Sequence, residues 1–213
     1  MGNKIFIYSF LGLGLLLQVI TYIVTQDSFL SLTSGLCGII SVVLCSRKKM
    51  LFYWFGFAQL FTYVALCLQQ KLYGEIAENM FYLVTMLYGM YHWHKNYDNE
   101  KLEVKTRGFN LETNLNVLSF TVIGIVLLYI TLSYTDDTQP FMDAITTVPA
   151  ITAQILMILR YKESWFYWLI IDIGSIIMWI NANDWCMVAQ FVFWSINCIY
   201  GYYNWRKNGE IQC

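Results

Sequence analysis

The stretch YGYYNW at residues 200–205 repeats YGMYHW at residues 88–93, and each copy is followed by two basic residues and an asparagine. FYW at residues 52–54 likewise recurs at residues 166–168. The first pair is offset by 112 residues and the second by 114, which requires a small gap between them. Similarity at a nearly fixed offset indicates an internal duplication. The alternative is an interfacial belt of aromatic residues that repeats by chance.

Composition places these units in a membrane. Of the 213 residues, 58% are hydrophobic and 13% are charged, whereas a soluble domain carries about 25% charged residues. Two prolines argue against a disordered or fibrous chain. A net charge of −1 without a basic stripe excludes nucleic acid as a partner. The remaining class is an all-α polytopic membrane protein, whose solvent is the lipid bilayer.

The sequence carries no pattern of catalysis or metal binding. Its six cysteines lack CxxC spacing, and nearly all lie in apolar runs, so we expect buried free thiols. Walker, HExxH and dinucleotide-binding glycine motifs do not occur. We therefore expect a protein that is not an enzyme and has no cofactor or resident metal.

Eight apolar segments are long enough to cross a bilayer as helices. The first lacks a small-residue cleavage site, so we interpret it as a helix and not as a signal peptide. The segments are 5–25, 29–45, 51–69, 76–94, 114–134, 140–159, 164–182 and 184–204.

The basic residues set the orientation of these spans. With eight spans both termini share one side, and 12 of the 13 lysine and arginine residues fall there, Lys71 being the exception. The opposite loops carry Asp27, Glu75, Asp136, Asp137 and Asp184. We therefore expect both termini in the cytoplasm and the protein in the cell inner membrane. Residues 96–113 then form a cytoplasmic linker, irregular or with a short surface helix.

The duplication predicts the architecture. Residues 29–94 and 140–204 each hold three helices, and one helix between them lets both copies start from the same face. We expect eight transmembrane helices, with two parallel three-helix repeats joined by one linker helix (3+1+3) plus an extra N-terminal helix. The units are 1–27 (extra helix), 28–95 (first repeat), 96–139 (linker and connecting helix), 140–207 (second repeat) and 208–213 (tail). Parallel repeats are typical of transporters that bind substrate near mid-bilayer.

Polar and aromatic residues follow one face of several spans at helical spacing. They include Glu78 and Tyr82; Trp165, Trp168 and Asp172; Gln154; and Gln190, Trp194 and Asn197. Asp172 lies near the middle of its span and should face the interior, because a charge facing lipid costs several kcal/mol. Alternatives are interhelical hydrogen bonding for Gln190 and Asn197, and interfacial positions for Glu78, Trp165 and Trp168.

WFYWLIIDI at residues 165–173 and QFVFWSINCIYGYYNW at residues 190–205 resemble the PnuC family of vitamin-precursor transporters. The resemblance extends from about residue 29 onward. It implies a 3+1+3 core similar to SWEET proteins, and facilitated diffusion of nicotinamide riboside followed by trapping through intracellular phosphorylation. Some relatives carry thiamine or riboflavin. By position, the implied site uses Trp165 or Trp168 with Gln190 and Asn197, and Gln59 and Asn79 from the first copy.

The chemistry of these residues suits a flat cation. Aromatic faces can stack on the pyridinium ring of nicotinamide riboside, amides can pair with its carboxamide and hydroxyls, and Asp172 can offset its charge. Thiamine fits the same description, and a ligand sensor without transport is a further alternative. Whether copies associate into a homo-oligomer stays open. The expected substrate-binding residues are Trp165, Trp168, Asp172, Gln190, Trp194, Asn197, Gln59, Asn79, Glu78 and Tyr82.

Overall fold

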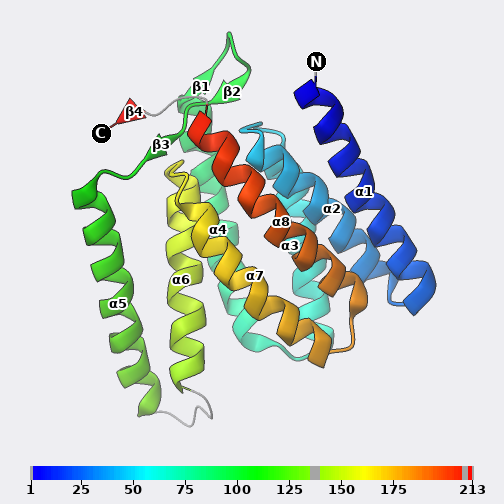
Figure 1. Ribbon diagram of the computed structural model, residues 1–213. Coiled ribbons are helices and arrows are strands. Elements are labelled where there is room, and N and C mark those ends of the chain that lie inside the picture. Colours follow the sequence, from blue (N-terminus) through cyan, green and yellow to red (C-terminus); the bar gives the residue numbers. More distant parts are fainter. Residues whose placement is uncertain (1, 135–139, 208–210, 213) are drawn as a thin grey trace.

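The computed structural model describes residues 2–134, 140–207 and 211–212, which form eight helices and four two-residue strands (Figure 1). The helices are α1 (Gly2–Thr25), α2 (Phe29–Ser46), α3 (Phe52–Gln69), α4 (Tyr73–Lys95), α5 (Leu111–Ser133), α6 (Pro140–Ile158), α7 (Ser164–Asn181) and α8 (Trp185–Lys207). Each begins and ends within a few residues of an expected span. Four of them, α1, α2, α5 and α7, are long and apolar enough to cross a membrane by themselves. Asp136 and Asp137, expected in an outer loop, lie outside the described residues, as does most of the tail.

The linker is not helical, so the expectation of a short surface helix is wrong. It forms β1 (Tyr97–Asp98), β2 (Glu103–Val104) and β3 (Arg107–Gly108). β1 pairs antiparallel with β2, and β3 pairs in parallel with β4 (Ile211–Gln212). The Asp98 carboxylate accepts hydrogen bonds from the backbone N–H groups of Glu100 and Lys101, which lower its pKa. This side-chain-to-backbone bonding favours a turn over a helix.

Four helices end in the same way, with a non-glycine residue in the left-handed conformation. These residues are Lys48 (φ 59°), Lys71 (φ 58°), Arg160 (φ 68°) and Asn183 (φ 54°). The next backbone N–H in each case bonds back into the last turn, as in a Schellman cap. Lys48 and Arg160 are 112 residues apart, and so are Lys71 and Asn183.

The backbone also corrects the expected alignment of FYW with residues 166–168. The bond from Phe52 N–H to Lys49 O recurs as the bond from Ser164 N–H to Tyr161 O, again 112 residues later. Both bonds fix the entry into a helix directly after a left-handed residue. The matching position is therefore set by the turn, and the shared aromatic letters two residues further on are coincidental.

Six helices pack together, and two lie at the edges of the molecule (Figure 1). α2 packs against α3 and α8, α4 against α3 and α6, and α7 against α6 and α8. α1 lies over α2 and α8, while α5 has its extensive helix contacts with α6 alone. Thr121 is the one buried residue that the structure describes in α5. An apolar helix exposed on nearly all sides fits a lipid environment, so the chain is a multi-pass membrane protein.

Two aromatic clusters close the bundle at different heights. The linker-side cluster contains Cys45, Phe52, Tyr53, Trp93, Val104, Met157, Trp165, Cys198 and Trp205. The opposite cluster contains Tyr63, Leu66, Cys67, Trp179, Met187 and Phe191. Cys45, Cys67, Cys186 and Cys198 are buried free thiols, as expected, whereas Cys37 is half-buried. The space between the clusters holds the cavity described next.

Candidate functional site

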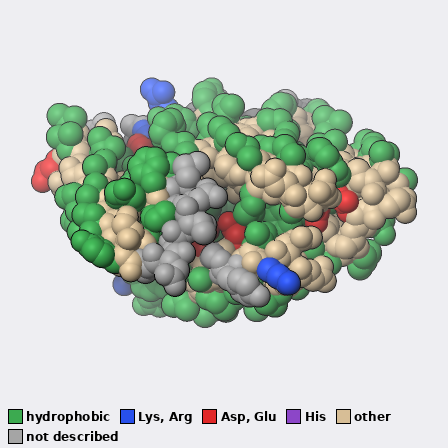
Figure 2. All heavy atoms as spheres, turned by 90° about the horizontal axis from the view of Figure 1, so that it is seen from below, with side chains coloured by type: hydrophobic (Ala, Val, Ile, Leu, Met, Phe, Trp, Pro, Cys, Tyr) green, Lys and Arg blue, Asp and Glu red, His purple; other side chains and the backbone are tan. Residues whose placement is uncertain are grey.

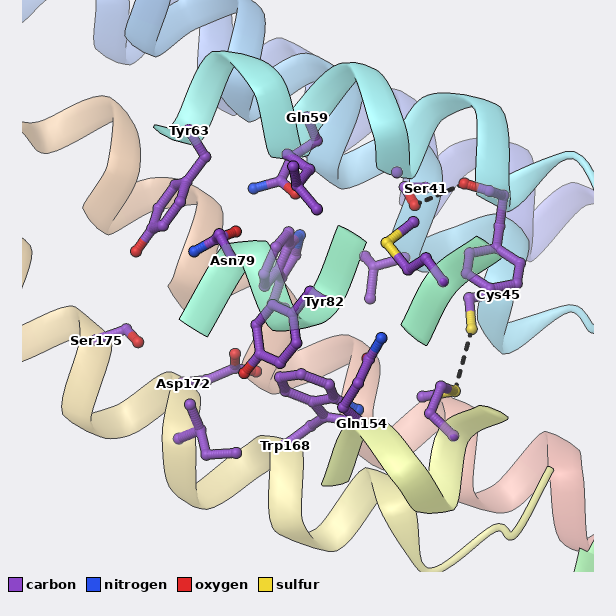
Figure 3. A pocket seen from close by; sticks show the side chains of 18 of the residues that line it. Ser41, Cys45, Gln59, Tyr63, Asn79, Tyr82, Gln154, Trp168, Asp172 and Ser175 are labelled. Carbon is purple, nitrogen blue, oxygen red and sulfur yellow. Dashed lines mark hydrogen bonds between the residues drawn. The ribbon is translucent and has the colours of Figure 1, made fainter. Parts of the chain in front are cut away.

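A cavity of about 180 Å³ lies inside the bundle, lined by α2, α3, α4, α6, α7 and α8 (Figure 3). Neither α1 nor α5 contributes a lining residue among those described. Seen from the side opposite the linker, the surface is hollowed and acidic side chains are visible inside it (Figure 2). On the linker side the cavity ends at the buried aromatic cluster.

The cavity brings together eight of the ten residues expected to bind substrate. They come from α3, α4, α7 and α8, so segments far apart in the chain meet at one place. The eight are Gln59, Glu78, Asn79, Tyr82, Trp165, Trp168, Asp172 and Trp194. Trp165 is 1% exposed, which contradicts a role as a lipid-interface anchor for this side chain.

Gln190 and Asn197 do not line the cavity, although both are fully buried. Asn197 donates its amide N–H to Val42 O of α2 at 3.2 Å. Gln190 lies against α2 at Gly38, where an added Cβ would be 3.0 Å from its side-chain carbon. One stripe of α8 therefore serves two purposes, because Trp194 faces the cavity while its neighbours a turn away face α2.

Asp172 is 2% exposed and faces the cavity from the middle of α7. The Cys198 thiol donates to its carboxyl group at 3.5 Å. Tyr82 points its hydroxyl end toward this carboxyl, and Trp168 lies beside them (Figure 3). The rings of Tyr82 and Trp168 meet edge to face, with centroids 5.8 Å apart. The site thus combines an acid with two aromatic surfaces of different orientation.

Amide groups line the wall around this acid. Gln154 of α6 donates its Nε2–H to Thr85 Oγ1 at 3.1 Å, and Asn79 donates its Nδ2–H to Glu75 O at 2.8 Å. Gln154 is on the polar stripe that the sequence shows for its helix, but the sequence gave no reason to prefer it as a binding residue. Its placement between Trp168 and Tyr82 comes from the packing of α4 on α6 (Figure 3).

Sequence reasoning missed Tyr63 and Glu75, which line the end of the cavity away from the linker. Tyr63 donates its hydroxyl to Glu75 Oε2 at 2.9 Å and accepts from Trp179 Nε1 at 3.2 Å. Glu75 belongs to the first turn of α4 and not to the preceding loop. Tyr63 lies one helical turn after Gln59, and this spacing is the signal that could have identified it.

Several polar atoms at the cavity have no hydrogen-bond partner among the described residues. They are Tyr53 Oη, Glu78 Oε1, Trp165 Nε1 and Trp194 Nε1. Buried polar groups are normally paired, so unpaired ones around a cavity indicate a ligand that completes them. The described lining residues include three carboxylic acids, Glu75, Glu78 and Asp172, and no lysine, arginine or histidine. This environment suits a flat, polar cation.

Comparisons with known proteins agree with this geometry. The sequence model of the family described as nicotinamide mononucleotide transporter matches residues 28–207. A protein named nicotinamide riboside transporter PnuC from Haemophilus influenzae is 32% identical over 97% of this chain and 92% of its own length. The protein of the same name from Neisseria mucosa is 29% identical over 96% of this chain and 81% of its own.

A solved structure also matches. The crystal structure of the vitamin B3 transporter PnuC superposes with a TM-score of 0.81 at 29% identity, over 97% of this chain and 91% of that one. The family match spans all six helices that line the cavity. On these grounds, the chain belongs to the nicotinamide mononucleotide transporter family.

Proposed function

We propose that this protein imports nicotinamide riboside across the cell inner membrane as a passive uniporter, and that phosphorylation inside the cell traps the product. The observation that carries the proposal is the pairing of a carboxyl group, Asp172, with the aromatic faces of Tyr82 and Trp168 in a buried cavity. The named relatives are nicotinamide riboside transporters, which supports the same substrate here.

The cavity residues divide the substrate among them. Trp168 and Tyr82 contact the pyridinium ring, whose positive charge is offset by Asp172. Gln154 pairs with the carboxamide, which carries both a donor and an acceptor, as Gln154 does. Glu78 and Asn79, with Gln59, pair with the ribose hydroxyls. The unpaired N–H groups of Trp165 and Trp194 supply further donors to the bound molecule.

The charge of the cavity favours the riboside over its phosphorylated form. Phosphate recognition in proteins relies on arginine, lysine or helix N-termini that point at the anion. Among the described lining residues there are three acids and no basic side chain. A mononucleotide would bring its phosphate next to these acids and would be repelled.

The proposed architecture is two parallel three-helix repeats, 28–95 and 140–207, with α5 as the connecting helix and α1 as an addition. The recurrence of helix ends at a spacing of 112 residues supports this division. Transport would proceed by rocking of the two repeats around the shared cavity. Both termini and the linker lie on the same side (Figure 1), which we propose is the cytoplasmic side because the lysines and arginines gather there.

Uptake of radiolabelled nicotinamide riboside into liposomes containing the purified protein tests the proposal. We expect saturable uptake that unlabelled nicotinamide riboside abolishes and nicotinamide mononucleotide does not. Thiamine, which is also a flat cation, is the discriminating competitor. Strong competition by thiamine, with little by the riboside, would assign the other vitamin. Liposomes without protein provide the baseline, and uptake no greater than theirs would refute transport of this compound.

A further inference from the structure

Two tryptophans close the cavity on the linker side. Trp93 of α4 and Trp205 of α8 are 0% and 1% exposed, with ring centroids 5.8 Å apart. Trp93 donates its indole N–H to Met157 O of α6, and Trp205 donates its own to Cys45 O of α2, both at 3.2 Å. The two acceptor residues touch as well, because the Cys45 thiol bonds to the Met157 sulfur at 3.4 Å.

The residues preceding these tryptophans make the same pair of contacts. His92 Nδ1 bonds to Ile158 O at 3.1 Å, and Asn204 Nδ2 bonds to Ser46 O at 2.8 Å. The acceptors are carbonyls in the last turns of α6 and α2, which a helix leaves without internal partners. Each bond joins one proposed repeat to the other, and each has a counterpart 112 residues away, the separation of Cys45 and Met157.

The linker crosses the same two helix ends. Val104 N–H donates to Lys48 O at 3.0 Å, and Arg107 N–H donates to Arg160 O at 2.9 Å, so residues 104–107 join the ends of α2 and α6. Between them, Thr106 donates its hydroxyl to Trp205 O at 3.0 Å. Val104 itself is 2% exposed within the linker-side cluster. We call residues 103–107 the strap.

The charged groups of the strap reinforce these contacts. Glu103 forms ion pairs with Lys48 at 3.7 Å and with Lys49 at 3.4 Å. Arg160 donates through Nη1 to Lys105 O at 2.6 Å. Burial lowers the pKa of Lys48, while the Glu103 carboxylate opposes this change. Both ends of the strap are therefore fixed to the left-handed residues that terminate α2 and α6.

We propose that this layer is the inner gate of the transporter: the cross-repeat bonds of Trp93 and Trp205 hold the ends of α2 and α6 together, and the strap locks them. The gate is closed in this structure, since the cavity is hollowed toward the opposite side and covered by buried aromatic rings on this one. Release of substrate to the linker side requires these helix ends to part. This inference rests on the proposed function, because a gate has meaning only in a transporter.

Cys45 provides a built-in reporter of gate opening, because it lies at the contact between α2 and α6 and is 4% exposed. The experiment uses the full chain in liposomes, with the other five cysteines replaced by serine. A membrane-impermeant maleimide is added on the linker side, and the rate of Cys45 modification is measured by mass spectrometry. Thr106→Val removes one strap bond, and Trp205→Phe removes one indole N–H while it keeps an aromatic ring.

We expect each variant to raise the rate of labelling from the linker side about tenfold, the factor that loss of one buried hydrogen bond can give. Trp54→Phe is the matched control, since Trp54 is 66% exposed on the lipid side, and its rate should equal that of the parent. Rates equal to the parent's in both folded gate variants would overturn the inference. Thr106→Val is the milder change and keeps the test valid if Trp205→Phe fails to fold.

The outcome is independent of the substrate assignment. If liposomes take up no nicotinamide riboside but the labelling rates change as expected, the gate stands and the substrate proposal fails. If uptake is normal and both gate variants label like the parent, the gate is wrong and the substrate proposal stands.

Discussion

Asp172 is a carboxylic acid in the middle of a membrane-spanning helix, and the Cys198 thiol is its hydrogen-bonding neighbour. A charge placed there facing lipid would cost several kcal/mol, so the side chain faces the cavity instead. Tyr82 and Trp168 stand beside it with their rings at 65° to one another. At the scale of single residues, these three side chains define what the cavity can bind.

The change Asp172→Asn should weaken binding of nicotinamide riboside about tenfold, because the amide has nearly the same size but no charge to offset the pyridinium. Tenfold corresponds to about 1.4 kcal/mol. Isothermal titration calorimetry on the purified protein measures the affinity. Asp98→Asn, in the exposed linker hairpin, removes the same charge far from the cavity and should leave the affinity unchanged. Unaltered affinity in Asp172→Asn would remove this carboxyl from the site.

The change Trp168→Ala should reduce affinity by roughly 1–2 kcal/mol through loss of the ring surface and its cation–π contact. Phe166→Ala is a suitable control, because Phe166 lies on the same helix but is 63% exposed toward lipid. The same calorimetric titration compares the two variants. Similar losses in both would indicate damage to α7 as a whole and would argue against a specific contact from Trp168.

Sequence spacing found the polar stripe of α8 but not the neighbour that each residue contacts. Gln190, Trp194 and Asn197 share a face by spacing, yet Trp194 lines the cavity while the two amides face α2. A helical face wide enough for three such residues borders more than one neighbouring helix, and spacing along one chain carries no information about where those neighbours lie. Asp172 was easier to place, because lipid excludes a charge from every outward direction.

At the scale of the elements, α8 approaches α7 closely at Gly201. A Cβ atom added there would lie 2.5 Å from the Trp165 ring. Gly89 of α4 is equally close to Tyr53, whose hydroxyl would be 2.7 Å from an added Cβ. Glycine at these positions lets a buried aromatic ring lie flat against the neighbouring helix backbone. The apolar runs revealed the helices themselves, whereas such contact points depend on how the helices pack.

Replacing Gly201 by alanine should destabilise the folded protein by about 1–3 kcal/mol, because the Trp165 ring is fully enclosed and cannot move aside. Thermal unfolding in detergent, followed by intrinsic fluorescence, reports the change. Gly174→Ala is the control, since no atom lies within 4 Å of its added Cβ; there, alanine should be neutral or stabilise by up to about 1 kcal/mol. An unfolding temperature for Gly201→Ala at or above that of Gly174→Ala would contradict the packing argument.

The linker shows why one element was predicted wrongly. Its composition gave no periodic apolar pattern, and a short helix was compatible with its charges. Its structure depends on distant partners, because Val104 and Arg107 bond to the ends of α2 and α6. β3 pairs with residues near the C-terminus, more than 100 positions away. Local sequence carries little information about such long-range pairing.

For the whole molecule, both chain ends and the linker lie on one face, and the hollow of the cavity faces the other way (Figures 1 and 2). We expect a green fluorescent protein fused at the C-terminus to fluoresce in cells, and alkaline phosphatase fused at the same point to be inactive. Fusions within the loop around Lys71 should give the reverse result. Active phosphatase at the C-terminus would invert the proposed orientation.

The acidic cavity also bears on the energetics of uptake. In a carrier that rocks around a fixed site, the lining side chains stay near mid-bilayer, so the net charge that crosses is that of the passenger. The described lining residues offer three carboxyl groups and no basic group that could cancel a cation. An inside-negative potential of about 100 mV is worth about 2.3 kcal/mol per elementary charge, equivalent to roughly 50-fold accumulation. A passive protein of this design would therefore work electrophoretically, and depolarising the cell would slow import without any change in affinity.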